Sequence, residues 1–538
     1  MYQLYGGAKV KKKQWTVFRH NGPFFPEEYK PHKIPVIISG KSVVLPRLVE
    51  EYITLYANYL DTDYIKNNKF KINFFNDLKK SLGDIKVNSI DDIDMTEIKK
   101  YIDSTKERKK NLSKEEKQRA KDKNDKIQEP YKYCVIDGSQ QKVGNYRIEP
   151  PGIFMGRGTH PKLGKIKKRI NPEDVIINID KNSPIPKPNV PGQWKKVIHD
   201  DNVIWLATWT DIISNKNKYV FTSMESIFKS KSDESKFDLA RSLKKKAKSI
   251  RDDYSRDLDS ESQTTRQLAT ALYFIDNLAL RVGGKKNTKE KADTVGVTSL
   301  RVEHLTFLDT NVIKLDFLGK DSIRYCKKIK VHDNIYNNLK TFIYNKEKKK
   351  ELFDKISNSS LNEYLESFMK GLTAKVWRTY NASNLFQKEL DKVKLETVLK
   401  IPDSERINYL ISFFNQANTS VALLCNHQKA VSGNLEKQLE TFNEKIKHLN
   451  HKKKKYKDKK NKEMISKIDA KIKTLKLKKE TKSKMKNVSL GTSKNNYIDP
   501  RIIFAFIKKF EIQPDKLFNK SLLTRFQWAQ TVTKDFKF

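Results

Sequence analysis

The chain has 538 residues, and its 109 Lys and Arg against 65 Asp and Glu give a formal net charge of +44 at pH 7. This length accommodates about two to four domains, each with its own core. An excess of positive charge on this scale attracts a polyanion, and nucleic acid is the favoured partner class. A basic ribosomal or chromatin protein and a peripheral protein on anionic membranes remain as alternatives.

The chain has three cysteines, Cys134, Cys326 and Cys425, and no C-x-x-C pair. This pattern argues against a disulfide framework and against a zinc site. The first residues lack an apolar signal region, and no apolar run is long enough to span a bilayer. We therefore predict a soluble protein of a reducing compartment that is not secreted.

The first third of the chain predicts a mixed α and β region. An aromatic, proline-punctuated stretch (WTVFRHNGPFFPEEYKP) precedes a short hairpin (VIISG and KSVVL). Residues 46–79 carry apolar side chains at helical spacing, which predicts helices packed by one face. Residues 104–128 are almost wholly polar and predict one solvated helix, in which Ser113 and Glu116 fit a capping box.

The middle of the chain changes from strand-like to helical patterns. Between about residues 131 and 224, short apolar runs (YCVID, DVIINI, VIWLATW, YVFTS) alternate with turn residues and predict strands. Residues 225–428 show helical periodicity, interrupted by a strand-like patch at 311–330. We expect a mostly helical domain that carries one small sheet.

Residues 433–487 consist largely of Lys, Glu, Asn and a few aliphatic residues. The aliphatic and aromatic side chains recur at alternating spacings of three and four: Leu435, Leu439, Phe442, Ile446 and Leu449, then Ile465, Ile468, Ile472 and Leu475. This spacing predicts two helices paired as an antiparallel coiled-coil hairpin. A disordered basic tether is the alternative. The tail, residues 489–538, is apolar enough to dock as a compact unit.

Five residues are candidates for phosphodiester chemistry. Breaking this bond without a metal requires a nucleophile, a proton donor for the leaving oxygen and fixed positive charges. Arg281, Lys320 and Arg378 lie in apolar or turn contexts where solvated cations are not expected, and His427 follows an apolar helix. Tyr497 lies in a polar, turn-prone stretch, so we expect its hydroxyl to be reachable. Each of them, taken singly, is more often a structural residue.

The segments that carry these residues resemble the eukaryotic-type type IB DNA topoisomerases. The matching stretches are WTVFRHNGPFFPEEY, EPPGIFMGRGTHPKLG, ALYFIDNLALRVGG, ADTVGVTSLRVEHL, DFLGKDSIRY, GLTAKVWRTYNAS, LCNHQ and LGTSKNNYIDPRI, and they extend from about Trp15 to Trp528. The resemblance implies an α+β multidomain fold: a two-lobed DNA clamp with a mixed α/β cap, a mostly helical catalytic domain, a coiled-coil linker and a small helical C-terminal domain.

The resemblance also implies domain boundaries. Core subdomain I, of mixed α/β type, comprises residues 1–28 and 113–225, and the helical core subdomain II comprises residues 29–112. Catalytic core subdomain III comprises residues 226–430. The linker comprises residues 431–487, and the C-terminal domain with the nucleophile comprises residues 488–538. The first two subdomains would form the cap of the clamp.

The resemblance assigns roles to the candidate residues. Tyr497 corresponds to the nucleophile, Lys320 to the general acid, and the remaining three, Arg281, Arg378 and His427, to the group that stabilises the phosphate. The implied activity is relaxation of supercoiled duplex DNA by transient single-strand cleavage through a 3′-phosphotyrosyl intermediate, without cofactor, metal or ATP. The absence of a P-loop motif agrees with this expectation. The implied partner is double-stranded DNA encircled by a monomer, with no membrane partner.

DNA contacts are expected from glycine-rich and turn segments. The glycines of PPGIFMGRGTHPKLG let the backbone approach a sugar-phosphate chain. The expected DNA-binding residues are Arg157, His160, Lys162, Asp321 and Asn496. In the family, the positions of Arg157, Asp321 and Asn496 also touch poisons of the camptothecin class. Met155 stands where the family usually has a basic residue, which is a departure in contact detail.

Two other functions compete with this interpretation. A tyrosine recombinase uses catalytic residues of the same types, but the linker before Tyr497 and the FLGKDSIRY context favour the topoisomerase. A non-catalytic architectural DNA clamp is the second alternative, and the presence of all five catalytic side chains argues against it. The expected location is the nucleus if the protein is cellular, and the virion or a cytoplasmic replication site if it is viral.

Overall fold

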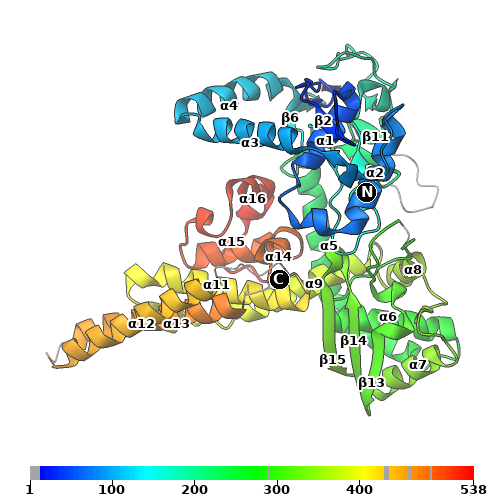
Figure 1. Cartoon of the computed structure of the whole chain (residues 1–538). Helices are drawn as coiled ribbons and strands as arrows, with labels where there is room; N and C mark the ends of the chain where they lie inside the picture. Colours follow the sequence, from blue (N-terminus) through cyan, green and yellow to red (C-terminus); the bar gives the residue numbers. More distant parts are fainter. Residues whose placement is uncertain (1–12, 289, 429–434, 459–461, 485–487) are drawn as a thin grey trace. The chain divides into compact units, whose positions relative to one another are not determined.

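The computed structural model describes residues 13–288, 290–428, 435–458, 462–484 and 488–538. The chain divides into two compact units, Met1–Lys229 with Asn287–Asp293, and Ser230–Lys286 with Thr294–Phe538. Both contain helices and small sheets, so the predicted α+β multidomain class is confirmed (Figure 1). The finer division into subdomains stays a prediction.

One part of the first unit has a core of helices packed on a short sheet. Its strands, in the order β3-β2-β4, are β2 (Val36–Ile38), β3 (Lys41–Val43) and β4 (Ile93–Asp94), and its helices are α1 (Arg47–Ala57), α2 (Asn68–Leu78) and α3 (Thr96–Asn111). Helix α1 buries Val49, Tyr52 and Ile53 against this core, and α2 buries Phe70 and Phe74. The predicted hairpin and the predicted helices of residues 46–79 are confirmed.

The polar stretch 104–128 forms two helices rather than the single predicted one. Helix α3 ends at Asn111, and α4 (Lys114–Gln128) begins after Ser113, whose backbone is extended (φ −61°, ψ 163°). The predicted capping box is present, because Ser113 Oγ accepts from the Glu116 amide at 3.0 Å and the Glu116 carboxylate accepts from the Ser113 amide at 2.8 Å. An N-cap residue lies outside the helix that it caps, so the capping box itself interrupts the helical run.

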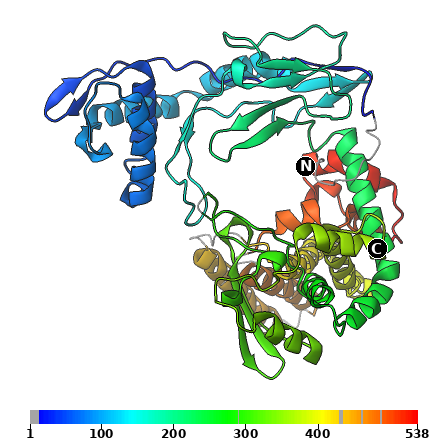
Figure 2. The same ribbon diagram turned by 90° about the vertical axis from the view of Figure 1, so that its right-hand side faces the viewer.

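The other part of the first unit is built from strands, as the alternating apolar runs predicted (Figure 2). One sheet has the order β1-β5-β6 and another β10-β9-β11-β12. Strand β7 pairs with β8, and this pair belongs instead to the helical core, into which it buries Ile153 and Ile166. The strands are β1 (Phe18–His20), β5 (Tyr133–Ile136), β6 (Ser139–Lys142), β7 (Gly152–Ile153), β8 (Ile166–Lys167), β9 (Ile176–Asn178), β10 (Lys196–Ile198), β11 (Ala207–Asp211) and β12 (Lys216–Val220).

The core of the second unit is mostly helical and carries one antiparallel sheet. Its helices are α5 (Ile227–Asp257), which starts in the first unit, and α6 (Gln263–Leu278), α7 (Asp333–Ile343), α8 (Asn358–Phe368), α9 (Ala374–Leu390), α10 (Leu395–Leu399) and α11 (Asp403–Leu424). The sheet has the order β13-β14-β15, from β13 (Leu305–Asp309), β14 (Val312–Leu318) and β15 (Arg324–Lys330). The predicted strand-like patch is confirmed as β14 and β15, and β13 extends it.

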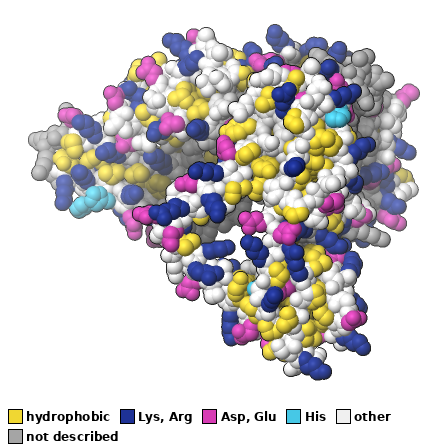
Figure 3. Space-filling view, turned by 90° about the horizontal axis from the view of Figure 1, so that it is seen from above, with side chains coloured by type: hydrophobic (Ala, Val, Ile, Leu, Met, Phe, Trp, Pro, Cys, Tyr) yellow, Lys and Arg dark blue, Asp and Glu magenta, His cyan; other side chains and the backbone are white. Residues whose placement is uncertain are grey.

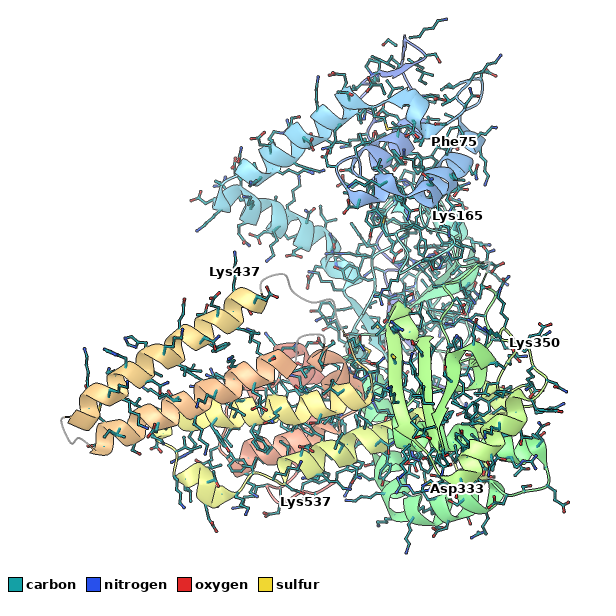
Figure 4. The ribbon with its side chains drawn as sticks, turned by 60° about the horizontal axis from the view of Figure 1, so that its bottom comes forward. Phe75, Lys165, Asp333, Lys350, Lys437 and Lys537 are labelled. Atoms are coloured by element: carbon teal, nitrogen blue, oxygen red, sulfur yellow. The ribbon has the colours of Figure 1, made fainter. Side chains whose placement is uncertain are left out.

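The basic segment before the C-terminal tail forms two helices that lie side by side. These are α12 (Leu435–Asp458), in which Lys437 is labelled in Figure 4, and α13 (Lys462–Lys484). Helix α13 also packs on α11 and buries Ile468 and Ile472. The predicted pair of helices is therefore present, while their supercoiling as a coiled coil stays a prediction.

The C-terminal tail docks on the helical core of the second unit, as predicted. It contains α14 (Leu490–Asn496), α15 (Pro500–Lys509) and α16 (Lys520–Arg525). Ile498, Ile502 and Ile503 of the tail belong to the same apolar cluster as the helices α6, α9 and α11. The tail thereby places residues around Tyr497 against the helical core.

The surface is rich in cationic side chains. Figure 3 shows Lys and Arg spread over the face that it displays, with fewer acidic side chains among them. Within the described ranges, no helix is both long and apolar enough to cross a bilayer. On this face the cationic side chains are exposed and can act on a polyanion.

Candidate active site

The predicted catalytic side chains come together in the second unit. A cavity of about 100 Å³ is lined by four of them, Arg281, Lys320, Arg378 and His427. The hydroxyl of the fifth, Tyr497, accepts hydrogen bonds from two of these residues. The five residues come from segments as far apart as residues 281 and 497, so the fold has gathered them.

Arg378 is the most completely bound of the cations. It lies in α9, it is 3% exposed, and its Nη1 donates to Tyr497 Oη at 2.8 Å. Its Nε donates to the Ala279 carbonyl at 2.6 Å and its Nη2 to the Cys425 carbonyl at 3.3 Å. Ala279 follows α6 with a left-handed φ of 49°, a conformation that is rare for alanine and that concentrates at functional sites. The guanidinium is therefore fixed on three sides.

Arg281 approaches the same hydroxyl from the segment that follows α6. Its Nη1 lies 3.4 Å from Tyr497 Oη, and its carbonyl accepts from the Val297 amide at 2.9 Å. The segment is held close to Gly296 by Gly283, whose φ is 82°. A Cβ at position 283 would come within 2.6 Å of the Gly296 Cα, so this close approach requires glycine.

Tyr497 is buried, contrary to the reachable position expected from its polar neighbours. It is 6% exposed, and its ring lies 4.8 Å below the Arg378 guanidinium and 5.3 Å from the His427 ring. The residue directly follows α14, and its carbonyl accepts from Ser383 Oγ of α9 at 3.0 Å. The expectation was wrong because docking of the tail, which local composition does not reveal, covers the ring.

His427 is buried beside Tyr497 and is held in a definite orientation. Its Nδ1 lies 2.8 Å from Ser493 Oγ, and within the described residues its buried Nε2 has no hydrogen-bond partner. Burial, followed by the positive charges of Arg378, Arg281 and Lys320, lowers the pKa of His427 to about 3. The imidazole is therefore neutral at physiological pH and carries a single N–H.

Lys320 differs from the others because its side chain is exposed. It begins the short connection between β14 and β15, where Asp321 and Ser322 both have left-handed φ angles, 66° and 59°. The connection is closed by the Gly319 amide, which donates to the Ile323 carbonyl at 2.8 Å. Lys320 is thus an exposed cation at a constrained turn on the edge of the cavity.

The predicted DNA-binding residues are divided between the units. Arg157, His160 and Lys162 lie in the first unit, where the Lys162 Nζ donates to the Ile213 carbonyl at 2.7 Å. Asp321 and Asn496 lie in the second unit, and Asp321 lines the cavity beside Lys320.

The side chain of His160 is oriented by its neighbours. Its Nδ1 accepts from the Lys162 amide at 3.1 Å, and its ring packs edge-on against Phe154 at 4.8 Å. A Cβ at Gly156 would lie 2.7 Å from the His160 Cβ, and the φ of Gly156 is 59°. The glycines expected to admit a nucleic-acid backbone thus also serve to fold this loop on itself.

The residue that our sequence interpretation missed is Ser493. It precedes Tyr497 by four residues on α14, and helical spacing alone places the two on one face. The spacing of Ser493 and Tyr497 was therefore a usable signal. The partner of Ser493, His427, lies 66 residues earlier and could not be identified from the local sequence pattern.

The cysteines and acidic residues do not form a metal centre among the described residues, because no group of three or more His, Cys, Asp or Glu could hold an ion there. Cys134, Cys326 and Cys425 are free thiols. Burial raises the pKa of the Cys425 thiol, so it stays protonated beside the site.

Three family profiles match the chain in sequence order. Residues 13–222 match the DNA-binding fragment of eukaryotic DNA topoisomerase I, and residues 225–460 match its catalytic core. Residues 469–538 match a C-terminal topoisomerase domain. Together these matches cover both units.

Individual relatives agree with this assignment. The chain is 41% identical to DNA topoisomerase 1 beta of Arabidopsis thaliana, over 98% of this chain and 60% of that protein. It is 39% identical to the mitochondrial DNA topoisomerase I of Homo sapiens, over 99% of this chain and 94% of that protein. It is also 39% identical to human DNA topoisomerase 1, over 98% of this chain and 72% of that protein. The chain therefore belongs to the eukaryotic DNA topoisomerase I family, the type IB isomerases whose motifs its sequence carries.

Proposed function

We propose that this chain relaxes supercoiled duplex DNA by cutting one strand, holding it through a 3′-phosphotyrosyl bond to Tyr497 and resealing it, without ATP or metal. The observation that carries the proposal is the convergence of Arg281 and Arg378 on the Tyr497 hydroxyl, at 3.4 Å and 2.8 Å. Two guanidinium donors at one oxygen stabilise the negative charge that this oxygen carries when it attacks phosphorus.

The proposed step is an in-line displacement at phosphorus. The bond from Tyr497 Oη to phosphorus forms while the bond to the 5′ oxygen breaks, and the phenol proton passes to solvent. Lys320 gives a proton to the departing 5′ oxygen, for which its exposed position at the hairpin suits it. Arg281, Arg378 and His427 line the cavity and would stabilise the non-bridging oxygens, His427 through its Nε2, which has no hydrogen-bond partner in the described residues.

Resealing is the reverse displacement, in which the free 5′ hydroxyl attacks the phosphotyrosyl phosphorus. The phosphodiester energy is retained in the covalent bond to Tyr497, so no nucleotide is required. The first unit, with Arg157, His160 and Lys162, would contribute backbone contacts that hold the duplex, in the manner of the cap of a monomeric clamp.

A non-catalytic clamp would need surface charge but no reactive centre. Tyr497 is 6% exposed and Arg378 is 3% exposed. Side chains buried to this extent would contribute little to a protein that only binds DNA at its surface. Burying a guanidinium has an energetic cost, which favours retention for chemistry rather than for DNA attraction.

The test is relaxation of supercoiled plasmid in EDTA without ATP. The wild type should relax the plasmid and form covalent DNA, whereas Tyr497→Phe should bind DNA and do neither, because only the nucleophilic oxygen is removed. Tyr344→Phe is the matched control, since this tyrosine of the same unit is 76% exposed, and it should behave as the wild type. A covalent complex on Tyr497→Phe, or a requirement for ATP or magnesium, would refute the proposal.

A further inference from the structure

We infer that Ser493 is a positioning residue for His427: its hydroxyl donates to Nδ1 and so leaves the imidazole Nε2–H to face the phosphate. This inference rests on the proposed function, because it concerns how the same site holds a phosphodiester. It assigns no contact between Ser493 and DNA.

The geometry places Ser493 between two proposed catalytic groups. Its side chain is fully buried, at 0% exposure, and its Oγ lies 2.8 Å from His427 Nδ1. Its carbonyl accepts from the amides of Tyr497, at 2.9 Å, and Ile498, at 3.0 Å. One residue thus fixes the histidine through its side chain and the tyrosine through its backbone.

The backbone of His427 is tied to the same C-terminal segment. The Ser489 amide donates to the His427 carbonyl at 2.8 Å, and Gln428 forms a bridge with Val488. These bonds fix the backbone from which the imidazole projects, and burial of the ring at 5% exposure with its contact to Ser493 sets the direction of each ring nitrogen before DNA binds. Within the described residues, Nδ1 points at Ser493 and Nε2 has no hydrogen-bond partner.

The chemistry decides which nitrogen must carry the proton. A neutral imidazole has one N–H, and in the chain without DNA burial and the nearby charges of Arg378, Arg281 and Lys320 keep His427 neutral by lowering its pKa to about 3. A non-bridging phosphate oxygen accepts hydrogen bonds, so Nε2 must carry the hydrogen when DNA is bound. Nδ1 is then an acceptor and needs a donor, and the Ser493 hydroxyl supplies it.

The first experiment is a double-mutant cycle on single-turnover cleavage of a duplex oligonucleotide. Ser493→Ala should slow cleavage about tenfold to a hundredfold, by analogy with the partners that orient metal-binding histidines. DNA affinity should not change, and Ser493→Thr should restore most of the rate because it returns the hydroxyl. In a His427→Gln background, where the amide donates without a tautomer, Ser493→Ala should cause no further loss.

Ser383→Ala is the matched control. Its buried hydroxyl donates to the Tyr497 carbonyl and accepts from the Asp499 amide, both at 3.0 Å. Because neither hydrogen bond involves His427, its effect should be the same in both backgrounds. A Ser493→Ala effect that is also the same in both backgrounds would overturn the inference, because Ser493 would then act without His427.

A second measurement separates this inference from the proposed function. The ring ¹⁵N shifts of His427 in Tyr497→Phe bound to duplex DNA report the tautomer without any cleavage. We expect hydrogen on Nε2, and hydrogen on Nδ1 would overturn the inference even if the wild type relaxes DNA. A wild type that forms no covalent complex, with hydrogen on Nε2, would instead contradict the proposed function alone.

Discussion

Replacing Arg378 by lysine separates the structural role of this side chain from its chemical one. The guanidinium donates to Tyr497 Oη and to the carbonyls of Ala279 and Cys425, at 2.8, 2.6 and 3.3 Å. A lysine keeps the charge but cannot reach three acceptors in these directions from a single ammonium group. At least one buried carbonyl then loses its donor, and each such loss costs about 1 to 3 kcal/mol.

We therefore expect Arg378→Lys to lower the free energy of unfolding by about 2 to 4 kcal/mol, measured by urea denaturation. Single-turnover cleavage should fall by about 10² to 10³, the effect of removing one well-placed donor to a transition-state oxygen. DNA affinity at low salt should change little, because the net charge is kept.

Arg281→Lys is the control for this prediction. Arg281 is only half-buried, and its hydrogen bond to Tyr497 Oη is long, at 3.4 Å. Its replacement should slow cleavage comparably yet cost less than about 1 kcal/mol of stability. Equal stability of the two variants would show that the bonds to Ala279 and Cys425 do not hold Arg378, and would refute the reasoning.

Two further predictions concern protons. Lys320→Ala should slow cleavage far more with a normal 5′ oxygen leaving group than with a 5′ sulfur, which needs no general acid, and equal slowing would remove Lys320 from that role. His20 is buried with Nε2 bonded to the Asn178 carbonyl and Nδ1 accepting from the Gly22 amide, and burial lowers its pKa to about 4. The unfolded chain then binds more protons between pH 6.5 and 4, so about 3 kcal/mol of stability should be lost as pH falls through this window. The urea midpoint of His20→Gln should depend less on pH than that of the wild type. If the midpoints of the two proteins show the same dependence on pH, His20 is not the origin of the lost stability.

The local sequence pattern was sufficient to predict those elements that are determined by interactions between neighbouring residues. The capping box of Ser113 and Glu116 depends on residues three apart, and the strands β14 and β15 follow from alternation over a few residues. Even so, the same capping box divided a stretch that polar composition had suggested was one helix. Strand β13 was missed because its sequence, LTFLD, is short and half exposed.

The site itself could not be assembled from local pattern. Each of its residues was ambiguous alone, and the grouping came from resemblance to a family rather than from spacing. The burial of Tyr497 follows from contacts with α9, 114 residues earlier in the chain, through Ser383. The Ser493–His427 contact crosses the basic segment between α11 and α14. Such contacts are set by tertiary packing, which neither composition nor periodicity contains.

The hydrogen-bond partners of Arg378 explain how the fold buries a positive charge without pairing it with a carboxylate. Two other arginines of this unit pair with carboxylates: the buried Arg525 with Asp233 and the half-buried Arg251 with Asp276. The partners of Arg378 in the described residues are instead two backbone carbonyls and a hydroxyl. These acceptors satisfy the N–H groups without cancelling the charge. Arg378 therefore keeps its positive charge beside the cavity, where this charge adds to the effect of burial in lowering the pKa of His427 and favours the entry of an anion such as a phosphodiester.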